Sequence, residues 1–344
     1  MKIAVLMGGT SAERDVSLAS GEAIVNALRV VGHQLVAIDT AKSQRLLESQ
    51  TEFLPEGVKP EPPDVRELAR KSKELTLRTI ESFDLNDVDV VFLALHGGAG
   101  EDGTIQALLD LTGKPYTGSG MLASALAMNK SIAKKIFERE GILTPKWFLL
   151  DSSNPADISK IAARIKEELG FPAVVKPDDQ GSTVGFSKVE EADELNAAVE
   201  KAREFSDRIL VEKFIEGREL TVAVLEDRPL PVVEIVPEHG IYDYLCKYTK
   251  GKSRYICPAE LSEEKTKEIQ KIGLKAFKSL GCESYARVDF RCSSKGDFYC
   301  LEVNSLPGMT ATSLVPMAAK QAGIDFPELV DRIAKMALRK KRRK

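Results

Sequence analysis

The sequence predicts an α/β protein of several domains, the first of which is an open, doubly wound parallel sheet. At 344 residues the chain is too long for one small hydrophobic core. The continuous apolar run KIAVLM at 2–7 is typical of a buried parallel strand. A glycine turn, a stretch with helical spacing at 17–31 and a second apolar run, QLVAID at 34–39, complete a βαβ unit.

The first block resumes this pattern after an interruption. Residues 41–88 are poor in strand signals, contain one expected helix at 64–82 and are interpreted as a surface elaboration. The apolar run DVVFLAL at 89–95 and a helix at 103–112 then continue the sheet. We therefore expect an N-terminal domain over 1–118.

Two further blocks follow, and each is expected to form a domain. The second, 119–211, begins with one long helix at 121–140 and contains two strands that flank a glycine-rich loop. The third, 212–344, is rich in strands, includes the hairpin SYARVDFRCSSKGDFYCLEV and closes with a helix at 326–338.

Composition and charge argue against several functional classes. The net charge is −3, from 49 basic and 52 acidic residues, which gives no general reason to expect a nucleic-acid partner. The basic run at 339–344 could touch anions, but a solvated terminus is the simpler interpretation. No stretch approaches the roughly 20 apolar residues of a membrane span, and the first apolar run is too short for a signal peptide. Five cysteines without a CxxC pair favour free thiols in a cytoplasmic protein.

The hairpin of the third block carries a candidate metal site. Strand alternation places Arg287 and Asp289 on one face of its first strand, and Cys300, Glu302 and Asn304 on one face of its second. If these polar faces converge, two carboxylates and an amide oxygen suit Mg²⁺, and the arginine would contact phosphate oxygens. The alternative is a solvated sheet face with a chance charge pattern.

The glycine-rich loop of the second block is a candidate phosphate site. Lys176 ends an apolar strand, and the loop QGSTVG at 180–185 follows it. Backbone N–H groups of such a loop can hold phosphate, although the sequence is not a Walker A motif. A plain hairpin turn remains the alternative. Glu212 and Lys213, beside apolar Val211 and Phe214, could contact a flat base.

Two polar residues follow the parallel strands of the first block. Glu13 lies in the turn after the first strand, where it could bind a cationic amine, and His96 directly follows the strand at 89–95. Ligands of open α/β sheets bind outside the carboxyl ends of the strands, where both residues are expected.

Together these motifs resemble the ATP-grasp superfamily and, within it, the D-alanine–D-alanine ligases. They occur in the family's order and cover nearly the whole chain except 41–88. The motifs are GGTSAERDVS (8–17), LHG…GEDG (95–103), YTGSG (116–120), MNK (128–130), VVKP…GSTVG (174–185), EKFIEGRE (212–219), YDYLCKY (242–248), ARVDF (286–290) and EVNSLPGMTATSLVP (302–316).

The resemblance implies a two-part ATP-grasp fold after a substrate-binding N-terminal domain, and an enzyme that joins two D-alanines through an acyl phosphate for peptidoglycan synthesis. It implies ATP and two Mg²⁺ ions, which Mn²⁺ can replace, as cofactors, and a cytoplasmic homodimer with no nucleic-acid or membrane partner. The alternatives are a ligase that forms D-alanyl-D-lactate or D-alanyl-D-serine, another ATP-grasp carboxylate–amine ligase, and a regulatory protein on a decayed ligase scaffold.

The resemblance also implies residue roles. The expected metal ligands are Asp289, Glu302 and Asn304. The expected nucleotide-binding residues are Lys130, Lys176, Gly181, Ser182, Glu212, Lys213, Ile215, Glu219 and Lys247. The expected substrate residues are Glu13, His96, Arg287, Ser313 and Leu314, and the expected catalytic residues are Glu13, Ser182, Tyr248, Arg287 and Gly308.

One of these positions bears on specificity. Tyr248 favours D-alanine as the second substrate, since relatives with other second substrates usually carry His or Phe there. The surrounding segment 239–258 is expected to be a mobile loop that orders over ATP and excludes water.

Overall fold

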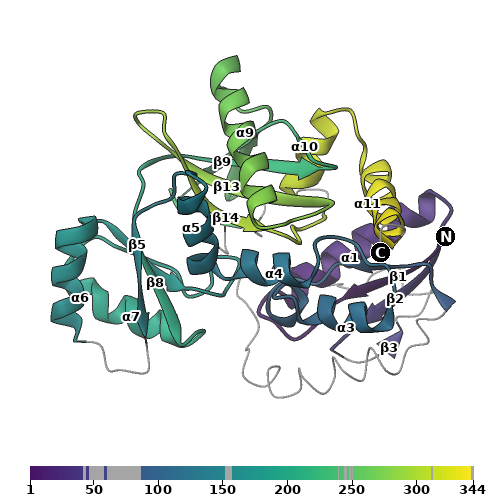
Figure 1. Ribbon diagram of the computed structural model, residues 1–344, viewed down its shortest axis with the longest axis horizontal. Coiled ribbons are helices and arrows are strands. Elements are labelled where there is room, and N and C mark those ends of the chain that lie inside the picture. Colours follow the sequence, from purple (N-terminus) through teal and green to yellow (C-terminus); the bar gives the residue numbers. More distant parts are fainter. Residues whose placement is uncertain are drawn as a thin grey trace.

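The described part of the chain forms three β-sheets in a computed structural model (Figure 1). The expected helix at 64–82 lies outside the described residues. The structure describes residues 1–41, 58–59, 87–151, 157–238, 240–243, 246–247, 249, 251–310 and 313–341, and the backbone of 44–45.

The first sheet has the order β3-β2-β1-β4. Its three longer strands, β1 (Lys2–Met7), β2 (Gln34–Asp39) and β4 (Val90–Leu93), are parallel, as the apolar runs predict. The short β3 (Gln44–Arg45) pairs antiparallel with β2. Helix α1 (Arg14–Val30) follows β1, a 3₁₀ turn (Gly98–Gly100) follows β4, and α3 (Thr104–Thr112) comes next.

The second sheet is antiparallel and has the order β5-β8-β6-β7. Its buried face packs against two helical segments around Phe148, Ile165 and Val199. The strands are β5 (Trp147–Asp151), β6 (Ala173–Pro177), β7 (Ser187–Val189) and β8 (Arg208–Lys213). The helical segments are α6 (Ile158–Arg164) with a π-helical turn (Ile165–Leu169), and a 3₁₀ turn (Ala192–Glu194) followed by α7 (Leu195–Arg203).

The third sheet is antiparallel, with the order β12-β11-β9-β13-β14 and β10 paired to β9. Helix α9 (Glu263–Ser279) shares a hydrophobic core with one face of this sheet. Part of the expected mobile segment 239–258 forms the edge strand β12. The strands are β9 (Gly217–Leu225), β10 (Arg228–Pro229), β11 (Val233–Pro237), β12 (Ser253–Ile256), β13 (Tyr285–Ser293) and β14 (Phe298–Asn304).

The last two helices, α10 (Leu314–Gln321) and α11 (Phe326–Lys341), return to the first sheet. Buried residues of both share one core with β1 and α1, and Figure 1 shows α11 near the N-terminus. His33 Nε2 lies 2.9 Å from Asp331 Oδ1 of α11, and the N-terminal amine lies 3.2 Å from His33 Nδ1.

The helix expected at 121–140 is two helices, which corrects the sequence-based prediction. Helix α4 (Met121–Met128) stops at Asn129, whose backbone is extended and whose Oδ1 accepts from Ile132 N at 3.0 Å. Asparagine is a favoured N-cap because its side chain satisfies an N–H group at the helix start. Helix α5 (Lys130–Arg139) therefore starts afresh at Lys130, the first residue after the cap.

The pairing of β13 with β14 corrects a second expectation. Asp289 pairs with Glu302, but Phe290 pairs with Cys300, so Leu301 is an extra residue in β14. Such a β-bulge breaks the alternation of faces. Cys300 therefore joins Phe290 in the core instead of sharing a face with Glu302.

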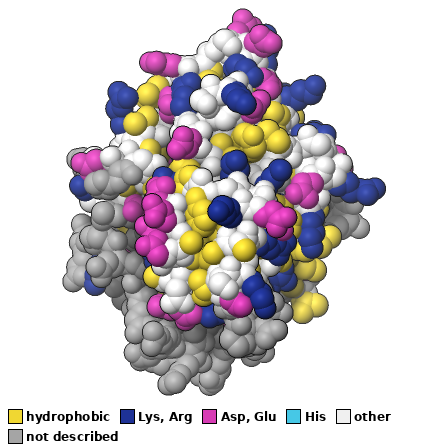
Figure 2. Space-filling view, turned by 90° about the vertical axis from the view of Figure 1, so that its left-hand side faces the viewer, with side chains coloured by type: hydrophobic (Ala, Val, Ile, Leu, Met, Phe, Trp, Pro, Cys, Tyr) yellow, Lys and Arg dark blue, Asp and Glu magenta, His cyan; other side chains and the backbone are white. Residues whose placement is uncertain are grey.

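The described residues on one face of the molecule show mixed charge. In Figure 2, which faces the end of the molecule that carries the second sheet, acidic and basic side chains are interspersed. Among the described residues, no helix is both long and apolar enough to cross a membrane. The sheets and helices together confirm the predicted α/β class.

Candidate active site

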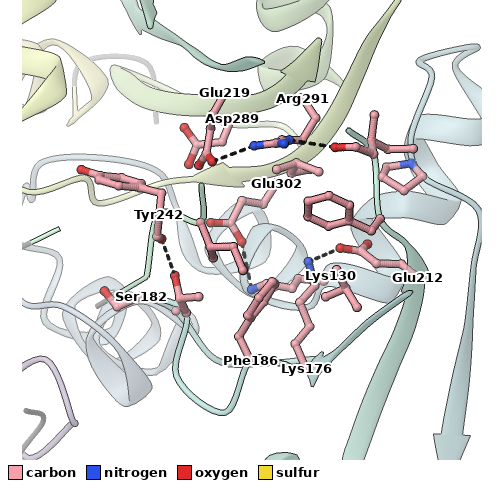
Figure 3. Close-up of a pocket in the computed structure, with 18 of the residues that line it drawn as sticks. Lys130, Lys176, Ser182, Phe186, Glu212, Glu219, Tyr242, Asp289, Arg291 and Glu302 are labelled. Carbon is pink, nitrogen blue, oxygen red and sulfur yellow. Dashed lines mark hydrogen bonds and ion pairs between the residues drawn. The ribbon is translucent and has the colours of Figure 1, made fainter. Parts of the chain in front are cut away.

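Two adjoining pockets collect the predicted site residues. The first, here the inter-sheet pocket, lies between the second and third sheets. Figure 3 shows Glu219, Asp289 and Arg291 along one wall, opposite Lys176 and Phe186. Its lining includes every residue predicted to bind nucleotide and two predicted metal ligands: Lys130, Lys176, Gly181, Ser182, Glu212, Lys213, Ile215, Glu219, Lys247, Asp289 and Glu302.

The second, here the strand-end pocket, lies at the carboxyl ends of the first sheet's strands. It meets the inter-sheet pocket where both are lined by Gly181, Ser182, Tyr242, Lys247 and Glu302. It brings together the described residues predicted to hold substrate, one further predicted catalytic residue and two predicted metal ligands: Glu13, His96, Arg287, Ser313, Leu314, Gly308, Glu302 and Asn304.

Lys130 is fixed at the start of α5. Its backbone N donates to Asp178 O at 2.9 Å, and its Nζ donates to Gln180 O at 2.7 Å and lies 3.1 Å from Glu302 Oε2. Burial alone would lower the pKa of Lys130, but the charge of Glu302 raises it. The ammonium group therefore stays charged at the mouth of the glycine-rich loop.

Glu212, on β8, is a buried carboxylate between two lysines. Lys176 Nζ lies 2.5 Å from its Oε1, and Lys134 Nζ lies 2.8 Å from its Oε2. Burial would raise the pKa of Glu212, but Lys134 and Lys176 lower it to about 2. Figure 3 shows the Lys176 contact at the base of the pocket.

The predicted metal ligands occupy neighbouring positions of the third sheet. Asp289 pairs with Glu302 across β13 and β14, and Asn304 pairs with Arg287. Arg287 binds both oxygens of Asp289, with Nε at 2.9 Å from Oδ1 and an Nη2 at 2.7 Å from Oδ2. Burial would raise the pKa of Glu302, but Lys130, with Lys176 and Lys247, lowers it to about 2. Each carboxylate is therefore already paired with a cationic side chain, Asp289 with Arg287 and Glu302 with Lys130.

The glycine-rich loop adopts a strained backbone that joins the pockets. Ser182 and Thr183 have φ of 48° and 63°, values that L-residues rarely adopt. The Ser182 hydroxyl donates to Glu13 Oε1. Thr183 Oγ1 donates to Tyr242 O at 3.0 Å and accepts from Lys247 Nζ at 2.9 Å, which ties the loop to the segment after β11.

Glu13 and Glu101 are the buried carboxyl groups of the strand-end pocket. Glu13 precedes α1, and burial raises its pKa, although Ser182 and Lys247 oppose the shift. A Cβ at Gly97 or Gly181 would lie 2.8 or 2.9 Å from Glu13 Oε2, so glycine permits this close approach. Glu101 Oε2 accepts from Gly97 N at 2.8 Å, and burial followed by the nearby Glu13 raises its pKa to about 8.

His96 is buried behind these groups. Its Nε2 lies 3.1 Å from Ser20 Oγ, which also accepts from Met309 N at 3.2 Å. Burial, reinforced by the charge of Arg287, lowers the pKa of His96 to about 4, so the ring is neutral at pH 7. Ser313 Oγ accepts from Thr310 N at 2.9 Å and faces Gly308, where a Cβ would lie 3.1 Å from it.

Some site features differ from what the sequence suggested. Tyr248 lies outside the described residues. Sequence reasoning assigned no role to Lys134, Glu101 or Arg291, whose guanidinium group donates to Ile215 O at 3.0 Å and lies 3.3 Å from Glu219 Oε2. The four-residue spacing between Lys130 and Lys134 was a usable signal, because it places both on one side of a helix.

Comparison with known proteins shows the family. The D-ala D-ala ligase N-terminus family matches residues 2–119, and the D-ala D-ala ligase C-terminus family matches residues 136–335. The D-alanine–D-alanine ligase of Pelotomaculum thermopropionicum is 41% identical, over 98% of this chain and 97% of that protein. That of Geobacter sulfurreducens is 44% identical, over 96% of this chain and 92% of that protein.

A solved structure agrees with these relatives. The crystal structure of D-alanine–D-alanine ligase from Bacillus anthracis complexed with ATP has a TM-score of 0.76 and 32% identity, covering 100% of this chain and 99% of that one. The predictions of an ATP-grasp fold and of an enzyme are thereby confirmed, and the chain belongs to the D-alanine–D-alanine ligase family.

Proposed function

We propose that this enzyme joins two D-alanines into D-alanyl-D-alanine at the expense of ATP, through an acyl phosphate. The observation that carries the proposal is the meeting of the two pockets at Ser182, Lys247 and Glu302. A phosphate group held in one pocket can there reach a carboxylate held in the other. Such phosphoryl transfer depends on positioning and charge neutralisation more than on covalent help from the protein.

In the inter-sheet pocket, the residues at the base fit a nucleotide. Lys130 and Lys176 would bind its phosphates, and Gly181, Ser182 and Lys247 would close over them. Glu212, Lys213, Ile215 and Glu219 would hold the adenine and ribose, partly through main-chain groups. The assignment is supported by the lysines that line this pocket, which can neutralise phosphate charge: Lys130, Lys176, Lys213 and Lys247.

Mg²⁺ fits the donor set of the third sheet. Asp289, Glu302 and Asn304 offer the hard oxygen ligands that Mg²⁺ prefers and leave places for phosphate oxygens. Because two carboxylates and one amide fill only part of an octahedral shell, phosphate and water oxygens would complete the coordination. Two ions bound there, Mg²⁺ or Mn²⁺ in its place, would neutralise charge on the phosphates.

In the strand-end pocket, Glu13 would pair with the ammonium group of the first D-alanine. His96 would lie near that substrate's carboxylate, and Ser313 and Leu314 would hold the carboxylate of the second D-alanine. Arg287 and the backbone N–H of Gly308 would stabilise the tetrahedral oxyanion. The hydrogen bond from Ser182 to Glu13 would couple closure of the glycine-rich loop over ATP to the position of Glu13 at the substrate.

The chemistry then has two steps. A carboxylate oxygen of the first D-alanine attacks the γ-phosphorus of ATP, and ADP leaves. The amino group of the second D-alanine attacks the acyl carbon, the C–O bond to phosphate breaks, and inorganic phosphate leaves. Tyr248 would complete the site with Glu13 and Ser182 and favour D-alanine as the second substrate.

The wider setting belongs to the same proposal. We propose that the product supplies peptidoglycan precursors and so supports cell shape, and that the enzyme acts as a cytoplasmic homodimer without nucleic-acid or membrane partners. The three domains proposed are 1–118, 119–211 and 212–344. The separate sheets support this division, and β8 runs across the second boundary.

The test is phosphate release from ATP and Mg²⁺ with D-alanine alone, with D-alanine plus D-lactate or D-serine, and with L-alanine, with product mass read in parallel. A dipeptide mass with D-alanine alone is the expected outcome, and chelation of the metal is expected to abolish it. A depsipeptide or D-alanyl-D-serine mass as the main product of a mixture would overturn the specificity. No turnover by folded, ATP-binding protein would overturn the substrate.

A further inference from the structure

Lys134 is a fully buried lysine that the mechanism above does not use. It lies on α5, one turn after Lys130, and its side chain is 0% exposed. Its Nζ lies 2.7 Å from Thr144 Oγ1, 3.4 Å from Pro145 O and 2.8 Å from Glu212 Oε2. A lysine so deeply buried is costly unless its partners are fixed.

These partners connect the two walls of the inter-sheet pocket. Glu212 belongs to β8 of the second sheet. Thr144 Oγ1 donates to Cys300 O of β14 at 2.8 Å, two residues before Glu302. Lys134 therefore joins the carboxylate on one wall to the backbone of the other.

The contact leaves Glu212 able to accept another hydrogen bond. Oε1 accepts from Lys176 Nζ. Oε2 is buried and lies in ion-pair contact with Lys134 Nζ at 2.8 Å. Glu212 also lines the pocket. Its carboxylate is thus held by two cations, with Oε2 turned to Lys134, and Oε1 keeps a second lone pair that can accept a further hydrogen bond.

We propose that Lys134 is a positioning residue that fixes the Glu212 carboxylate as the acceptor for the exocyclic amino group of adenine. It thereby sets both nucleotide affinity and the preference for a 6-amino purine. This inference rests on the proposed nucleotide role of the inter-sheet pocket. A purely structural lysine would stabilise the fold without distinguishing one purine from another.

The first experiment compares Lys134→Met with Lys135→Met, a matched control at the exposed next residue of the same helix. The dissociation constants of ADP and of purine riboside diphosphate, which lacks the 6-amino group, are measured by calorimetry. Lys134→Met is expected to weaken ADP binding about tenfold and purine riboside diphosphate binding much less, because a hydrogen bond to a charged group is lost. Lys135→Met is expected to match the wild type. Equal weakening of both nucleotides, or no weakening, would overturn the proposal.

A second pair of variants covers the case in which Lys134→Met does not fold. The double variant Lys134→Met/Glu212→Gln leaves no unpaired buried charge between these two positions. If Lys134 acts through Glu212, the double variant and Glu212→Gln bind ADP with the same affinity and the same small purine preference. A further tenfold loss in the double variant would show that Lys134 acts independently.

The outcome separates this inference from the ligase proposal. Nucleotide binding is measured without D-alanine, so a wild type that binds ADP but forms no dipeptide would refute only the proposed reaction. In active enzyme, Lys134→Met is expected to raise the KM for ATP while leaving the KM for D-alanine unchanged.

Discussion

The glutamate side chains of the two pockets have pKa values that are shifted in opposite directions. In the inter-sheet pocket, the pKa values of buried Glu212 and of half-buried Glu302, which also borders the strand-end pocket, are lowered to about 2. In the strand-end pocket, the pKa of Glu13 is raised and that of Glu101 is raised to about 8. Burial disfavours the charged form in all four cases, so the partners decide the direction.

Those partners match the ligand that each pocket would receive. Lysines contact the inter-sheet carboxylates and keep them ionised, and Lys130 and Lys176 also line the pocket, where they could bind a triphosphate. Glu13 is bonded instead to the hydroxyl of Ser182, and Glu101 to a backbone N–H group. A carboxyl group without an ammonium partner gains most when a ligand supplies one, as an amino acid does.

The largest expected effect breaks the charge balance of the inter-sheet pocket. Glu302→Gln removes the ion-pair partner of Lys130 and a proposed metal ligand. Its kcat is expected to fall about a thousandfold, the size typical for loss of transition-state charge stabilisation. The rate of ADP formation at saturating D-alanine and Mg²⁺ measures it, with circular dichroism as the folding control. A rate within tenfold of the wild type would contradict the assignment.

A change in the strand-end pocket is expected to leave the affinity for nucleotide unchanged. Glu13→Gln keeps a hydrogen-bond acceptor for Ser182 but loses the charge offered to the substrate ammonium group. The KM for the first D-alanine is expected to rise about a hundredfold, since charge-assisted hydrogen bonds are among the strongest. The dissociation constant of ADP serves as the control. A parallel loss of ADP affinity would mean that the pockets are not electrostatically separate.

Removal of the link between the pockets is expected to cost less. Ser182→Ala deletes the hydroxyl that joins the glycine-rich loop to Glu13 but keeps the backbone of the loop. A fall in kcat/KM of about tenfold is expected, because one hydrogen bond is lost and the pocket charges are kept. The effect should appear in D-alanine and ATP kinetics alike, whereas an effect on ATP alone would refute the linking role.

The change with the smallest expected effect on catalysis is at Glu101, where the predicted effect is on the pH dependence of stability. The folded-state pKa of Glu101 is raised above its unfolded value of 4.5, so its contribution is fully present below pH 4.5 and is lost as pH rises through about 8. Glu101→Gln mimics the protonated group and should remove this loss. At pH 8 its melting temperature is expected to exceed that of the wild type by about 5 °C, with no difference at pH 4. A constant offset at both values would contradict the shifted pKa.

Local patterns in the sequence were enough to predict much of this arrangement. Apolar runs predicted the parallel strands, and alternation placed Arg287 and Asp289 on one face of β13. The bulge at Leu301 was not predictable, because strand register depends on pairing rather than on the order of residues. The partner of Lys134 was equally hidden, since Glu212 lies 78 positions further along the chain. Long-range contacts of buried charges carry no periodic signal.

The packing of α11 against α1 has a consequence for synthesis on the ribosome. Residues of β1 and α1 share their core with Leu329, Val330 and Ile333. While the chain is being translated, the first sheet lacks this cover until residues 326–341 have left the exit tunnel. A segment that emerges before α11 is therefore completed only when α11 packs on it, and its apolar face is open to other contacts in the meantime.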